Sequence, residues 1–229
     1  MSLKLYYDLL SQPSRALYIF LKVCNIPFEQ KLINLRNGEH LTTEYQKIHR
    51  FQKVPAIEHD GFYIIESVAI LRYICREFKV ADHWYPKESK SQVKIDEYLE
   101  WQHLNTRLHC ALYFRLKYLV PILSGQPAKQ ETIMKHEKYL DETLDALENI
   151  WLKDKNFLVG SEISIADILC ACEVEQVRIA GYNPCEGRPN IALWMERVAR
   201  KTSPYYQEAH VILNKLVDKQ KQNALKSKF

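Results

Sequence analysis

The sequence predicts an α/β domain with a four-stranded mixed sheet, followed by an all-α helical bundle. Three observations support this prediction. Strand and helix patterns alternate through the first part of the chain, a β-hairpin signal lies near residue 60, and every long periodic segment after residue 90 has helical spacing. We therefore divide the chain into a sheet domain (residues 1–80), a linker (81–90) and a helical domain (91–229).

The sheet domain opens with a strand, a helix and a second strand. Residues 3–7 have strand alternation, and residues 14–23 carry apolar side chains at helical spacings of three and four, with Pro13 near the helix start. Residues 28–33 have the pattern of a second strand. Because a helix connects these two strands, we expect them to be parallel, with a right-handed crossover.

A hairpin and a helix complete the sheet domain. Residues 54–59 and 62–65 are separated by Asp60-Gly61, a dipeptide that favours a tight turn between antiparallel strands. A helical pattern follows Glu66, and Ser67 is the predicted N-cap of that helix. The domain is thus expected to contain four strands.

The remainder of the chain has helical periodicity, with predicted helices over residues 96–119, 131–152, 192–201 and 207–219. Ser164-Ile165-Ala166-Asp167 has the form of a capping box, with Asp in place of Glu, before an apolar run. Basic residues gather after residue 216, where we expect a solvated and frayed tail. They are Lys219, Lys221, Lys226 and Lys228.

Composition narrows the function classes. A 47% apolar and 26% charged chain is typical of globular proteins with a sizeable core. No run approaches the roughly 18 apolar residues of a membrane span, and the N-terminus lacks a signal-peptide pattern. The net charge of +4 is mild and no nucleic-acid-binding motif is present. The six cysteines form no C-x-x-C pair, so we expect a cytoplasmic protein without a metal site. The apolar runs and the missing binding motif lead us to expect no membrane partner and no nucleic-acid partner.

Ser11 stands where the first strand meets the first helix. The N-terminus of a helix presents unpaired N–H groups and a positive dipole, so a hydroxyl there can contact a bound anion. The alternative is that Ser11 serves only as a helix N-cap.

The motifs taken together resemble those of the glutathione S-transferases, the theta class in particular. Val54-Pro55-Ala56 resembles the segment that carries a cis-proline in thioredoxin-like domains, Glu66-Ser67 the site of the γ-glutamyl end, and Ser164 with Asp167 the structural box of the helical domain. The resemblance covers about residues 1–215. The motifs that point to the theta class are Ser11-Gln12-Pro13-Ser14-Arg15-Ala16, Gly38-Glu39-His40, Asp82-His83-Trp84-Tyr85-Pro86, Glu97-Tyr98-Leu99-Glu100-Trp101 and Glu186-Gly187-Arg188-Pro189.

This resemblance implies a thioredoxin-like first domain, glutathione as co-substrate, no metal, and a homodimer. It also implies a set of site residues. Ser11 would donate a hydrogen bond to the glutathione thiolate, and Arg107 would be a second catalytic residue facing it. The implied glutathione-binding residues are Ser11, His40, Lys53, Val54, Glu66 and Ser67. The implied electrophile site holds Leu104, Asn105 and Arg107, and Pro55, Ser164 and Asp167 have structural roles.

The function implied is conjugation of glutathione to small hydrophobic electrophiles such as halides and epoxides, with peroxidase activity as an option and detoxification of xenobiotics as the role. Because the chain ends at Phe229 after a basic stretch, we expect an open electrophile site. The alternative is a binding protein of the same fold without turnover. A third possibility, a glutaredoxin-like reductase, is disfavoured because it needs a Cys at one of two positions that are occupied by Ser11 and Ser14.

Overall fold

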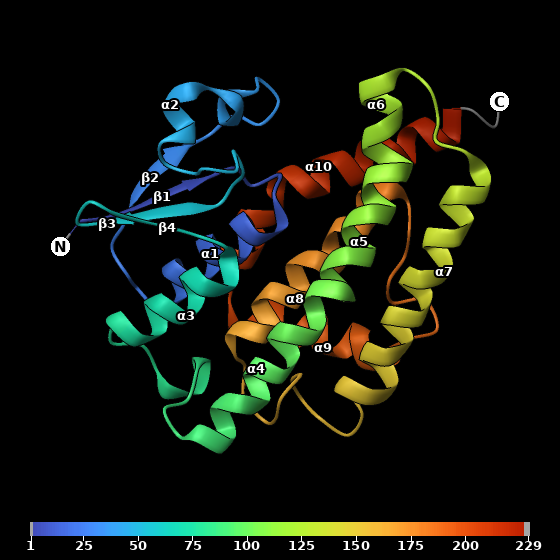
Figure 1. Ribbon diagram of the computed structural model, residues 1–229. Coiled ribbons are helices and arrows are strands. Elements are labelled where there is room, and N and C mark those ends of the chain that lie inside the picture. Colours follow the sequence, from blue (N-terminus) through green and yellow to red (C-terminus); the bar gives the residue numbers. More distant parts are fainter. Residues whose placement is uncertain (1, 227–229) are drawn as a thin grey trace.

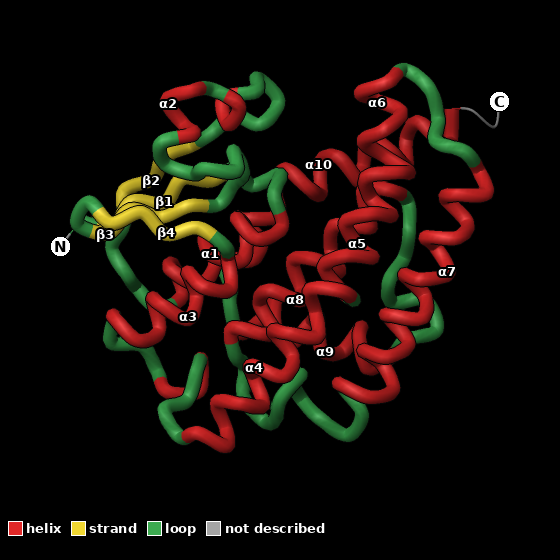
Figure 2. The backbone as a smooth tube through the Cα atoms, viewed as in Figure 1, coloured by secondary structure: helices red, strands yellow, loops and turns green. Residues whose placement is uncertain are grey.

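The computed structural model describes residues 2–226, with the backbone alone for residues 224–226. A sheet domain packs against a larger helical domain (Figures 1 and 2), as the sequence predicts. The four strands are ordered β2-β1-β3-β4 in one sheet. Their bounds are β1 Leu3–Tyr7, β2 Glu29–Leu32, β3 Ala56–His59 and β4 Phe62–Ile65.

The pairing of the strands is mixed, as expected. Strand β1 runs parallel to β2 and antiparallel to β3, and β3 pairs with β4 as a hairpin. Tyr6 lies opposite Ala56, which in turn lies opposite Ile65. This register places the end of β1, the start of β3 and the end of β4 at one edge of the sheet, so the loops at that edge meet.

Three helices accompany the sheet. Helices α1 (Gln12–Val23) and α3 (Ser67–Glu77) lie on the face toward the helical domain, and the short α2 (Thr43–Gln46) lies on the other side (Figure 1). Ten consecutive residues of α1, from Gln12 to Leu21, are buried. That extent of burial exceeds one amphipathic face, because α1 packs between the sheet and the bundle.

The helical domain contains α4 to α10, joined in places by short 3₁₀ or π turns. The α-helices are α4 Ser89–Leu104, α5 Thr106–Phe114, α6 Val120–Ser124, α7 Gln130–Ala146, α8 Ile165–Gln176, α9 Pro189–Lys201 and α10 Tyr205–Lys226. The turns within it are η3 Arg115–Leu119, η4 Leu147–Trp151 and η5 Val177–Ala180, whereas η1 Glu39–Leu41 lies in the sheet domain and η2 Asp82–Trp84 precedes α4. Among the described residues, no helix combines the length and the apolar character that crossing a bilayer requires.

Helix α8 is the centre of the molecule (Figure 1), and every one of its residues is buried. Phe20 of α1 and Leu169 of α8 belong to one continuous hydrophobic cluster that extends to Trp194 of α9. The two domains therefore share a core. The segment expected to be a linker is itself partly packed into that core, since Trp84 and Tyr85 are buried and α4 already begins at Ser89.

The prediction of one helix over residues 96–119 is wrong. The helix ends at Leu104, and α5 begins at Thr106. Between them Asn105 has φ −122° and ψ −96°, and its side-chain Nδ2 donates to the carbonyl of Trp101 at 2.8 Å. Asn side chains compete with the backbone for such hydrogen bonds. Apolar spacing continues across this single residue, so periodicity did not reveal the break.

Two helix ends also differ from the predictions. Ser67 is the first residue of α3 rather than its N-cap, and Glu66 holds the N-cap position with a positive φ of 69°. The basic tail is not frayed over the described residues, because α10 continues to Lys226. Lys228 lies outside them.

The capping box before α8 is present and reaches further than its sequence form shows. Asp167 is fully buried, and its carboxylate accepts hydrogen bonds from the backbone N–H and hydroxyl of Ser164, each at 2.9 Å. It also accepts from the N–H of Leu158 at 2.8 Å and from the indole of Trp194 at 2.9 Å. One carboxylate thus joins the start of α8 to α9 and the preceding loop.

Replacing Asp167 by Ala is expected to lower the free energy of unfolding by about 3–5 kcal/mol, because four donors lose their acceptor and the buried ones cost about 1–3 kcal/mol each when unpaired. Ser164→Ala removes one donor and is expected to cost about 1 kcal/mol. Urea denaturation followed by circular dichroism measures both. Equal losses for the two variants would contradict the central role given to Asp167.

Candidate functional site

The candidate site lies at the sheet edge where the strand register gathers the loops. The turn after β1 leads to Ser11, the segment before β3 holds Lys53, Val54 and Pro55, and the end of β4 leads to Glu66 and Ser67. Leu32 at the end of β2 pairs with Tyr7 at the end of β1, so the loop that leads from β2 to His40 begins at the same place. Residues from four separate stretches of sequence therefore converge.

Ser11 is half-buried at the N-cap position of α1, with extended backbone angles. Its carbonyl accepts from the N–H of Arg15, but its side chain makes no capping hydrogen bond. Within the described residues, the Ser11 hydroxyl has no hydrogen-bond partner at all. The alternative that Ser11 serves only as an N-cap is therefore not supported, and its hydroxyl is free to donate to a ligand.

Val54 precedes a cis peptide bond to Pro55, as expected from the resemblance. Strand β3 starts only at Ala56, and neither the N–H nor the carbonyl of Val54 is paired with another described residue. The neighbouring carbonyl of Lys53 accepts from the hydroxyl of Tyr45 at 2.8 Å, which fixes the segment. Val54 thus presents free backbone groups to an extended ligand.

Glu66 has a positive φ of 69°, an uncommon conformation for a residue with a side chain. Such backbone strain concentrates at functional sites. It allows the chain to turn directly from β4 into α3, so that Ser67 is the first helical residue. The hydroxyl and N–H of Ser67 then lie together at a helix N-terminus, which is a favourable position for a carboxylate.

A pocket of about 170 Å³ opens between the sheet domain and the helical domain. Its lining includes six of the residues singled out from the sequence: Lys53, Val54, Pro55, Glu66, Ser67 and Arg107. Ser11, His40, Leu104 and Asn105 are not part of this lining, although Pro13 beside Ser11 is. Leu104 is 72% exposed, and Asn105 is bonded back to its own helix.

Arg107 of α5 forms an ion pair across the helical domain. One guanidinium nitrogen, Nη1, donates to both carboxylate oxygens of Glu173, at 3.0 and 3.1 Å. Glu173 is almost fully buried on α8, and burial raises the pKa of its carboxyl while Arg107 opposes that rise. Arg107 is 40% exposed, so its other nitrogens remain available to the pocket. It is thus more than an exposed helical charge.

The pocket also contains residues that the sequence analysis did not select. They are His49, Gln102, His103, Leu169 and Glu173. Glu173 could have been found from the sequence, because it is an acidic residue in a largely apolar helical run. Such a residue is rarely buried without a partner. His49 is held in its loop by the N–H of Phe51, and burial lowers its pKa. Nothing in the sequence distinguishes Gln102 or His103 from other helical polar residues.

Comparisons with known proteins identify the family. The chain matches the model of the glutathione S-transferase N-terminal domain over residues 1–76 and of the C-terminal domain over residues 112–201. It is 42% identical to glutathione S-transferase theta-1 of Bos taurus over 96% of this chain and 92% of the relative.

Two solved human structures are also similar. The apo form of human glutathione S-transferase T1-1 has a TM-score of 0.91 at 40% identity, with 95% of this chain and 91% of that chain covered. A human theta-class enzyme in complex with the glutathione conjugate of 1-menaphthyl sulfate has a TM-score of 0.90 at 34% identity, with 99% and 92% covered. The chain therefore belongs to the glutathione S-transferase family, as an enzyme of the theta class.

Proposed function

We propose that the cleft binds glutathione with its sulfur beside Ser11 and transfers the thiolate to small hydrophobic electrophiles. The observation that carries this proposal is the Ser11 hydroxyl, which is free of any capping bond at the start of α1. It stands at the same sheet edge as the unpaired backbone of Val54 and the helix N-terminus at Ser67. A donor for the sulfur and partners for the rest of the tripeptide are thus close together.

The thiolate is the reactive form, and a free thiol with a pKa of about 8.5 is mostly protonated at neutral pH. Lowering that pKa by two units requires about 2.7 kcal/mol of preference for the anion. A hydrogen bond to an ionised group contributes about 1.5–3 kcal/mol. A Ser11 hydroxyl that donates to the sulfur, aided by the N-terminus of α1, meets this requirement without a basic partner.

The other groups of glutathione have matching residues. Ser67 binds the γ-glutamyl carboxylate at the helix N-terminus, and the exposed carboxylate of Glu66 attracts the α-amine. Val54 forms backbone hydrogen bonds with the cysteinyl unit. Lys53 and His40 bind the glycyl carboxylate. Charges of both signs around one pocket suit a ligand that itself carries both.

Electrophiles enter from the helical side, where Arg107 faces the pocket. We assign Arg107 to the stabilisation of an anionic leaving group, since a positive charge near developing negative charge lowers the barrier. The substrates that fit are alkyl and aralkyl halides and epoxides, with organic hydroperoxides as a second class and xenobiotic detoxification as the role. The conjugate bound to the human relative joins the sulfur of glutathione to an apolar aromatic group, as the proposed products would.

We also propose that the enzyme is a homodimer. Large apolar side chains are exposed on the sheet domain, with Phe51 at 58%, Phe62 at 63% and Tyr63 at 44%. Phe62 and Tyr63 lie on the edge strand β4. Exposed apolar side chains on and near an edge strand favour burial by a partner.

Replacing Ser11 by Ala is expected to lower kcat/KM about 10- to 150-fold at pH 6.5, the effect of losing 1.5–3 kcal/mol of anion stabilisation. The pH profile should shift upward by one to two units, because the thiol of bound glutathione regains its ordinary pKa. Ser14→Ala is a matched control, since its hydroxyl is buried next to the site without a partner. Full activity of Ser11→Ala at unchanged stability would refute the role of Ser11.

Arg107→Ala is expected to lower kcat about tenfold for substrates with a halide or sulfate leaving group, through loss of about 1.4 kcal/mol of charge stabilisation. The KM for glutathione should stay within about twofold, because Arg107 does not bind the tripeptide. Arg115→Ala, an exposed arginine on the adjoining η3, is the control. A higher KM for glutathione with an unchanged kcat would contradict a role at the leaving group.

Light scattering coupled to gel filtration should give twice the mass of one chain. Phe51→Asp is expected to shift the enzyme to the monomer, because it places a charge in the apolar contact. Lys79→Asp changes an exposed charge in the same domain and should leave the dimer intact. A monomeric wild-type protein at micromolar concentration would overturn the proposal.

A further inference from the structure

The cleft contains one carboxylate that the proposed function leaves without a role. Two acidic residues line it, Glu66 and Glu173, and only Glu66 is assigned to glutathione. Glu173 lies on the fully buried helix α8, and its own side chain is almost fully buried. A buried acidic residue needs a partner, and here that partner is Arg107.

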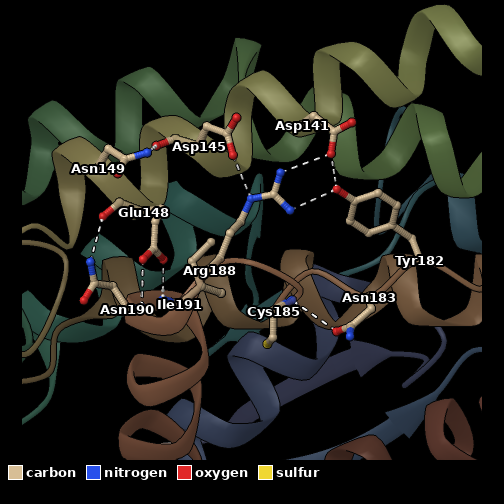
Figure 3. Close-up of polar contacts among 10 residues, drawn as sticks. All are labelled: Asp141, Asp145, Glu148, Asn149, Tyr182, Asn183, Cys185, Arg188, Asn190 and Ile191. Carbon is tan, nitrogen blue, oxygen red and sulfur yellow. Dashed lines mark hydrogen bonds and ion pairs between the residues drawn. The ribbon is translucent and has the colours of Figure 1, made fainter.

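A buried carboxylate elsewhere in the helical domain shows what a structural partner set is. Glu148 accepts the backbone N–H groups of Asn190 and Ile191, both at 2.9 Å, and so caps the start of α9 (Figure 3). Glu173 accepts no backbone N–H among the described residues, and its hydrogen bonds there come from one guanidinium nitrogen. It therefore caps no helix, and its charge acts on the cleft.

The ion pair leaves part of the Arg107 guanidinium free. Only Nη1 bonds to Glu173, at 3.0 and 3.1 Å from the two carboxylate oxygens. Nη2 and Nε have no partner in the described part of the chain, and the arginine side chain is 40% exposed. Because α8 is enclosed by a close-packed core, the carboxylate cannot move away when an anion approaches. The donors that an anion needs are thus present, but a fixed negative charge already lies beside the cation.

This arrangement treats a developing charge and a finished one differently. When the thiolate attacks a substrate R–X, the S–C bond forms, the C–X bond breaks and its electron pair leaves with X, so the full negative charge arises only in the product. The free N–H donors stabilise X as it takes up charge. Glu173 repels an anion more strongly the more charge that anion carries, so the free product is affected most. Release of product limits the rate of many enzymes.

We infer that Glu173 prevents Arg107 from retaining the halide or sulfate that the reaction releases. The inference rests on the proposed function, in which Arg107 contacts the leaving group. Glu173 acts through Arg107 as a positioning residue and does not itself touch the substrate. Its charge is required as well as its shape, because an unpaired guanidinium in a partly buried site is a strong binding site for anions.

The wild-type enzyme provides the first test, with bromide and sulfate as the probes. An epoxide serves as the substrate, because ring opening keeps its oxygen within the conjugate and releases no anion. Inhibition by either added anion, with the ionic strength held constant by gluconate, is expected to be weak, with a Ki above about 10 mM. A Ki below that value would overturn the inference without any variant.

Glu173→Gln keeps the size of the side chain and one oxygen that accepts from Nη1, but it removes the charge. It is expected to lower the Ki of bromide and of sulfate about tenfold, because the repulsion between the carboxylate and the anion is lost. Progress curves with an alkyl bromide should slow as bromide accumulates, whereas those with the epoxide should not. A merely structural role predicts the opposite, since a displaced Arg107 binds anions more weakly.

Glu175→Gln is the matched control, because Glu175 is also buried on α8 but accepts from Arg178 and Tyr206 outside the cleft. It should leave both Ki values unchanged, and equal effects of the two Glu→Gln variants would contradict the inference.

Arg107→Ala separates the inference from the proposed function. If anion inhibition is the same in Arg107→Ala, Glu173→Gln and the wild type, Arg107 does not face the leaving group, and the proposed role of Arg107 fails together with the inference. If Arg107→Ala removes the inhibition but Glu173→Gln does not strengthen it, the inference alone is overturned.

Discussion

The arrangement of this enzyme depends on one buried guanidinium, that of Arg15. Its side chain is fully buried, and burial lowers its pKa. Nη1 donates to the carbonyl of Leu9 at 2.9 Å, while Nη2 donates to the carbonyl of Cys172 at 3.1 Å and to Gln176 at 2.6 Å. A buried charge is tolerated when most of its donors are paired, and of the Arg15 nitrogens only Nε lacks a partner among the described residues. The acceptors come from the loop before α1 and from α8, so this pairing requires the two domains to dock in a single way.

The geometry of the site depends on how the two domains pack together. Leu9 belongs to the turn that ends at Ser11, and α8, which holds Cys172 and Gln176, also supplies Glu173 to the cleft. The carboxylate of Glu173 in turn fixes Arg107. The sheet domain alone provides the loops that meet at its edge, but the orientation of Arg107 toward them is set through α8. The glutathione half and the electrophile half of the cleft are thus joined by a helix without an exposed residue.

The sequence was informative where a feature depends on neighbouring residues. Alternation predicted β1, Asp60-Gly61 predicted the hairpin, and the box at Ser164 predicted the start of α8. The sequence was less informative where a single residue or a contact between distant segments determines the structure. The break at Asn105 interrupts no apolar pattern, and the positive φ of Glu66 became visible only in the backbone. Residues contributed by α8 were missed because their place in the cleft follows from domain packing, which one-dimensional spacing does not encode.

Helix α8 also carries the packing of the helical domain into the cleft. It passes directly into η5, and every one of its residues is buried. A helix enclosed by a close-packed core is held as a rigid element. Because Glu173 belongs to this helix and accepts both hydrogen bonds from Arg107, the position of Arg107 in the cleft is determined by the core rather than by the surface of α5.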